Sequence, residues 1–148
     1  MKCLLIIVCV SFFFSTQSFA QSNEITKKKF YDGKFNQQDT SIGYTEAVLV
    51  DNVIYISGWL DKGTIAEQLQ GIYTALGKIL KAYGATYQNV VKETLFTTNI
   101  EAVKSNNEVR KAFYKGDYPA ATWIQITRLF LARADAQIEV ELIAHLPR

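Results

Sequence analysis

Residues 117–144, DYPAATWIQITRLFLARADAQIEVELIA, decide the fold of this chain. Pro119 and Ala120 open a stretch rich in β-branched and aromatic residues, which predicts a strand over about 122–131. A second strand is predicted over about 136–145. The chain therefore ends in two consecutive strands joined by a short loop.

Two helices are predicted upstream of these strands. The first runs from Thr64 to Gly84, because Thr64 and Glu67 have the spacing of a capping box and apolar residues recur every three or four positions. Gly84 is expected to end it as a C-cap. The second is expected over 100–114, and the Gly and Pro residues that follow stop it.

Three further strands complete the predicted secondary structure. Residues 43–58 have the pattern of a β-hairpin with a turn at Asp51 and Asn52, and residues 90–98 form another apolar, β-branched run. The order of elements predicts an α+β fold with a single mixed β-sheet and two helices packed on one face. The strands carry apolar residues on both sides, so we expect the uncovered face to meet another subunit.

The first twenty residues have the features of an export signal. Lys2 precedes an apolar run, and Ser18-Phe19-Ala20 provides the small residues that signal peptidase requires. The apolar run is shorter than the roughly 20 residues of a membrane-spanning helix, so we expect a periplasmic or secreted protein with no membrane contact after cleavage. The expected layout is a signal peptide at 1–20, a polar leader at 21–41 and one domain at 42–148.

Composition excludes several kinds of site. Lys and Arg total 16 against 14 Asp and Glu, and loss of Lys2 leaves a mature net charge near +1, which predicts no nucleic-acid partner. Both cysteines, Cys3 and Cys9, lie in the signal, and His145 is the sole histidine. We therefore expect no metal site of the usual nitrogen-and-sulfur type and no Ser-His or Cys-His nucleophile.

The order and spacing of short motifs across residues 42–144 resemble the Rid family of reactive-intermediate deaminases, also called YjgF-like proteins. The matching pieces are Ile42-Gly43-Tyr44, Ile54 to Gly58, Gln68, Gly84-Ala85, Val90 to Lys92, Asn107 to Val109, Phe113-Tyr114, and Pro119-Ala120 with the strands that follow. The resemblance implies a YjgF/chorismate-mutase-like fold and a homotrimer with small-molecule clefts between subunits. Active members hydrolyse 2-imino acids, or their enamine forms, to 2-keto acids and ammonia without a cofactor.

The resemblance also implies which residues face the ligand. The glutamate that positions the attacking water corresponds to Glu139. The remaining ligand-facing positions fall on Tyr44, Ser57, Trp59, Asn107, Ala121 and Thr122. Trp59 stands where the family usually has Gln, and it is expected to narrow the cleft.

Ala121 is the main departure from the family pattern. Active members have an arginine there, which holds the substrate carboxylate by two parallel hydrogen bonds. Loss of such a desolvated contact costs about 2–5 kcal/mol, and a methyl group cannot replace the charge. Arg128 is seven residues away and cannot stand in for it.

Three interpretations follow from these residues. The first is an exported trimer that binds a small metabolite and has weak or no imine deaminase activity. The second is a hydrolase with an altered substrate that uses Glu139 with Thr122 and Ser57. The third is a noncatalytic, chaperone-like protein whose cleft is filled by Trp59. Export and the near-neutral charge argue against a ribonuclease.

Overall fold

A computed structural model of the chain describes residues 24–31, 33–36, 43–130 and 135–147. The predicted signal peptide lies outside the described residues. In chain order the elements are β1 (Lys28–Tyr31), β2 (Lys34–Phe35), β3 (Ala47–Val50), β4 (Val53–Leu60), α1 (Ile65–Ala82), the 3₁₀ turn η1 (Tyr87–Asn89), β5 (Val90–Thr97), α2 (Ile100–Ser105), α3 (Glu108–Tyr114), β6 (Ala120–Gln125) and β7 (Ile138–His145).

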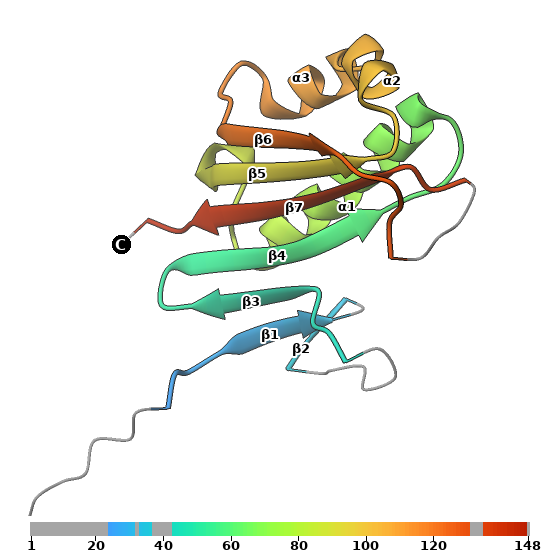
Figure 1. The fold of residues 1–148 in the computed structure, drawn as a ribbon. Helices are drawn as coiled ribbons and strands as arrows, with labels where there is room; N and C mark the ends of the chain where they lie inside the picture. Colours follow the sequence, from blue (N-terminus) through green and yellow to red (C-terminus); the bar gives the residue numbers. More distant parts are fainter. Residues whose placement is uncertain (1–23, 32, 37–42, 131–134, 148) are drawn as a thin grey trace, which may run out of the picture.

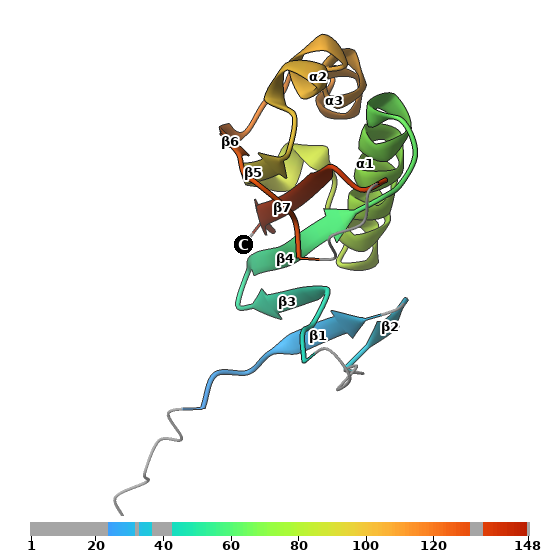
Figure 2. The same cartoon turned by 45° about the vertical axis from the view of Figure 1, so that its right-hand side comes forward.

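All described strands form one sheet in the order β2-β1-β3-β4-β7-β5-β6 (Figure 1). β5 and β6 are parallel and the other neighbours are antiparallel, so the sheet is mixed, as predicted. The helices lie together on one side of the sheet (Figure 2). Inward-facing residues of β4, β5 and β7 pack against α1 and form the core.

The start and end of α1 confirm the predicted boundaries. Thr64 accepts a hydrogen bond from the backbone of Glu67, and the Glu67 side chain accepts one from the Thr64 backbone, which completes the capping box. Gly84 follows the helix with φ +77°, the left-handed conformation that glycine adopts without steric cost. Leu69, Ile72 and Leu76 are buried along the predicted apolar stripe.

The segment predicted as one second helix forms two helices, α2 and α3. The described chain therefore has three α-helices on the sheet, and the expectation of two was wrong. The break lies between α2 and α3, at Asn106 and Asn107. Asn106 Nδ2 donates to the carbonyl oxygen of Ala102 at 2.9 Å, and asparagine side chains that bond to nearby backbone favour helix ends. Asn99 caps the start of α2 by accepting from Ala102 N.

Two strand boundaries differ from the sequence prediction. β1 and β2 fall within the segment predicted as a polar leader, where Tyr83 Oη lies 3.0 Å from both Lys28 O and Ala47 O and so ties β1 and β3 to the end of α1. β6 ends at Gln125 rather than near residue 131. Its neighbour in the sheet, β5, ends at Thr97, so the chain beyond has no strand to pair with.

The sheet face opposite the helices is uncovered (Figure 2). Tyr55 is 50% exposed and Ile124 is 39% exposed, and both project from this face. Within the described residues, we find no helix with the length and apolar character needed to cross a membrane.

Candidate functional site

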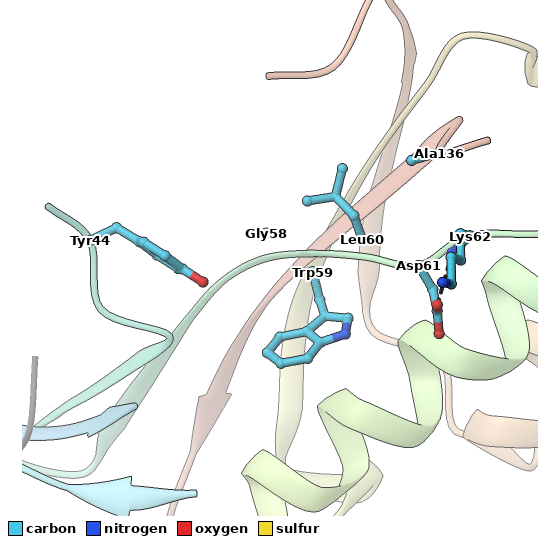
Figure 3. Close-up of a pocket in the computed structure, with 7 residues that line it drawn as sticks. All are labelled: Tyr44, Gly58, Trp59, Leu60, Asp61, Lys62 and Ala136. Atoms are coloured by element: carbon cyan, nitrogen blue, oxygen red, sulfur yellow. Dashed lines mark hydrogen bonds between the residues drawn. The ribbon is translucent and has the colours of Figure 1, made fainter. Parts of the chain in front are cut away.

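A pocket of about 300 Å³ opens beside the end of β4 (Figure 3). Trp59 and Leu60 extend to opposite sides of this strand, and Tyr44 points toward it from the segment before β3. The pocket is lined by Tyr44, Gly58, Trp59, Leu60, Asp61, Lys62 and Ala136. Two of the predicted ligand residues, Tyr44 and Trp59, therefore share one pocket.

Glu139 lies beside Gly58, one of the residues that line this pocket. It pairs with Leu60 across the β4–β7 ladder, after a bulge between Ile56 and Trp59. A Cβ atom placed on Gly58 would be only 1.9 Å from Glu139 Oε1, so the carboxylate occupies the space that the glycine leaves. Burial raises the pKa of Glu139, and the nearby charge of Glu141 raises it further.

Ser57 is not among the residues that line the pocket. Its Oγ donates a 2.7 Å hydrogen bond to the backbone carbonyl of Thr45, and its backbone N–H donates to Glu46 O. The Ser57 hydroxyl therefore fixes the segment before β3 onto β4. Its proton is not available to a ligand in this arrangement.

The remaining predicted site residues lie at the β6 edge of the sheet, on β6 and just before α3. Ala121 and Thr122 are exposed on the edge strand β6, and Thr122 Oγ1 is hydrogen-bonded to Lys92 Nζ. Asn107 lies just before α3. Its Oδ1 atom is buried and has no hydrogen-bond partner among the described residues.

One chain cannot place Ala121 and Glu139 around the same ligand. Ala121 pairs with Glu93 in the parallel β5–β6 ladder and so projects toward the helices, whereas Glu139 alternates with the buried Ile138 and Val140 and projects from the uncovered face. β5 separates their strands, so the strands lie roughly 10 Å apart. The predicted site residues therefore form two groups in each chain.

Sequence reasoning missed a buried charged cluster next to Ala121. Glu93 is fully buried, and its carboxylate accepts hydrogen bonds from four side chains. The donors are Arg110 Nε at 2.7 Å, Tyr114 Oη at 2.8 Å, Tyr73 Oη at 2.9 Å and Trp123 Nε1 at 3.2 Å. The polar strand residues 92–94 gave no sign of which of them points inward.

Arg110 is held in this cluster by its charge and by aromatic rings. Its guanidinium carbon lies 4.9 Å from the ring centroid of Tyr114 and 5.5 Å from those of Tyr118 and Trp123. Burial lowers the pKa of Arg110, but the adjacent Glu93 charge outweighs that effect and the pKa is raised. Arg110 therefore supplies a guanidinium beside Glu93, the strand partner of Ala121, but the Glu93 carboxylate already neutralises it.

Comparisons with known proteins agree with this architecture. The sequence profile of the family described as Endoribonuclease L-PSP matches residues 34–146. A human protein named 2-iminobutanoate/2-iminopropanoate deaminase is 34% identical over 110 residues, covering 68% of this chain and 78% of that protein, and the Rattus norvegicus protein of the same name is 36% identical over the same shares.

Solved structures match the fold as well. A putative endoribonuclease from Thermotoga maritima superposes with a TM-score of 0.66 at 30% identity, covering 73% of this chain and 91% of that one. A YjgF family member from Neisseria meningitidis superposes with a TM-score of 0.70 at 23% identity, covering 84% and 98%. The second match bears on the fold alone.

Proposed function

Because this chain belongs to the YjgF/Rid family, we propose that it is an exported member that binds a small metabolite in clefts between the subunits of a homotrimer. We further propose that it has little or none of the imine deaminase activity for which its relatives are named. Export rests on the sequence of residues 1–20.

The division of the site residues into two groups carries the proposal. Tyr44, Trp59 and Glu139 lie beside β4, whereas Asn107, Ala121 and Thr122 lie at the β6 edge. A cleft that uses both groups needs the β6 edge of one subunit against the β4 end of another.

The proposal of weak deaminase activity rests on charge at the β6 edge. Ala121 provides none, Arg110 is neutralised by Glu93, and Lys92 offers only a single ammonium group, which is hydrogen-bonded to the Thr122 hydroxyl. A substrate carboxylate at this edge therefore lacks the two-point contact that an arginine makes.

A hydrolase with an altered substrate is the second candidate. The raised pKa of Glu139 and its place beside an open pocket suit general acid or base chemistry. The open pocket also counts against the noncatalytic, chaperone-like alternative, which needs Trp59 to fill the cleft. The small net charge supports no nucleic-acid role.

Sedimentation of the mature protein, residues 21–148, tests the assembly. We expect a mass of three chains, and we expect Ile124→Asp to dissociate it, because a charge would replace an apolar side chain that is 39% exposed on the uncovered face. Ile25→Asp is the matched control, since Ile25 is 61% exposed and precedes the first strand of the sheet. A monomeric parent protein would contradict the shared cleft.

A further inference from the structure

Two residues of opposite charge, Lys92 and Glu141, lie on the uncovered face of the sheet, on the neighbouring strands β5 and β7. Lys92 precedes the fully buried Glu93 in β5, so its side chain projects away from the helices. Glu141 is exposed, lies between two buried residues of β7, and projects from the same face. The face that we expect to meet another subunit therefore carries charges of both signs.

These two charges do not pair with each other within one chain. The β5–β7 ladder pairs Glu141 with Thr94, two residues beyond Lys92, so the charged residues are only diagonal neighbours. The Lys92 ammonium is hydrogen-bonded to the Thr122 hydroxyl of β6, on the side of β5 that faces away from β7. Because this hydroxyl is neutral, the Lys92 charge stays uncompensated, and the ammonium keeps further protons to donate.

Glu141 also has no counter-charge. Among the described residues, no lysine or arginine forms an ion pair with it. Its neighbour on the same face of β7 is Glu139, a second carboxylate, whose pKa is raised by burial and further by the charge of Glu141. The Glu139 side chain fills the space beside Gly58, whereas Glu141 is exposed. Glu141 is therefore the carboxylate of this face that is open to a cation from another chain.

We propose that Lys92 of one subunit forms an ion pair with Glu141 of the neighbouring subunit where their uncovered faces meet. This inference rests on the proposed homotrimer. A closed ring of three is built from contacts between two different parts of the subunit surface. The proposed cleft sets the β6 edge of one subunit against the β4 end of the next. Lys92 is directed toward β6 and Glu141 lies on the β4 side of β5, so this contact brings opposite charges together.

The surroundings of the two charges strengthen the proposed pair. Ile124 of β6 and Tyr55 of β4 project from the same face and are 39% and 50% exposed in the single chain. A second subunit that covers these side chains would also exclude water from the neighbouring charges. A charge that is desolvated in this way is strongly unfavourable when it meets a like charge or loses its partner.

Charge reversal tests the pair, with sedimentation of the mature protein measured over a range of concentrations. Lys92→Glu and Glu141→Lys should each raise the concentration of half-dissociation by at least about tenfold, because each sets like charges against each other. The double variant, which carries both substitutions, should assemble like the parent. Lys78→Glu, at an exposed lysine of α1, is the matched control and should leave assembly unchanged. Circular dichroism checks that every variant is folded.

A mixture of the two single variants distinguishes a pair between chains from a pair within one chain. Each variant carries two like charges at positions 92 and 141, and mixing cannot change that arrangement inside a chain. In a mixed ring of three subunits, however, two of the three contacts would join opposite charges. The mixture should therefore assemble at concentrations where neither variant assembles alone, and continued dissociation of the mixture would contradict a pair between chains.

The outcomes separate the ion pair from the assembly on which it rests. A monomeric parent protein would overturn the homotrimer and the ion pair with it. If the parent is trimeric but a single charge reversal leaves its association unchanged, the ion pair is wrong while the homotrimer stands. The ion pair is equally wrong if both single variants dissociate and the double variant does not recover.

Discussion

Arg110→Met is expected to lower the free energy of unfolding by about 3–5 kcal/mol, because it leaves the buried Glu93 charge without its counter-charge. Glu93 is fully buried and the Arg110 side chain is 9% exposed, so water cannot replace the lost partner. The hydroxyl groups of Tyr73 and Tyr114 would still donate to the carboxylate but carry no charge. Urea unfolding at one fixed protein concentration measures the difference, since assembly also contributes to stability.

Lys111→Met provides the matched control on the same helix. Lys111 pairs with Glu108 at 2.7 Å, but the two side chains are 46% and 82% exposed. Removal of such a surface pair changes stability by at most about 1 kcal/mol. Equal losses of unfolding free energy in Arg110→Met and Lys111→Met would contradict the expected stabilisation by the buried pair of Arg110 and Glu93.

Gly58→Ala is expected to weaken binding of 2-oxobutanoate by about tenfold or more without unfolding the protein. The added Cβ would lie 1.9 Å from Oε1, 2.6 Å from Cδ and 2.7 Å from Cγ of Glu139, so the glutamate must leave its place beside the pocket. The displaced side chain would alter both the shape and the charge of the site. NMR titration measures the affinity, and circular dichroism checks the fold.

Gly77→Ala is the control for the added methyl group. Gly77 lies inside α1, and a Cβ there would meet Phe113 Cε2 at 3.5 Å, an ordinary van der Waals contact. Alanine in a helix interior is about 0.5–1 kcal/mol more favourable than glycine, so this variant should bind normally and be slightly more stable. Unchanged affinity in Gly58→Ala would mean that Glu139 does not shape the binding site.

The fold was largely predictable because its elements carry local signals. The capping box at Thr64, the apolar stripe of α1 and the glycine at position 84 are each readable from the chain, and each appears in the structure. The break between α2 and α3 was not predicted, because residues 100–114 contain no Gly or Pro. There the bond from Asn106 to Ala102 O competes with helix continuation.

The site was harder to predict than the fold. Lys62 is an ordinary lysine in a short connection, and only the position of β4 relative to α1 brings it to the pocket. Glu93 lies between Lys92 and Thr94 in a strand with polar residues on both faces, so alternation alone does not show which side is inward. Likewise, the separation of Ala121 from Glu139 depends on strand order, which no local pattern encodes.

Ammonia release from freshly generated 2-iminobutanoate tests the central claim most directly. The mature protein lacks a guanidinium at position 121, and the buried Arg110 is neutralised by Glu93. We therefore predict that it will not accelerate ammonia release above the rate in buffer. Appreciable turnover that is abolished by Glu139→Gln would contradict this claim and would show that the chain is an active deaminase.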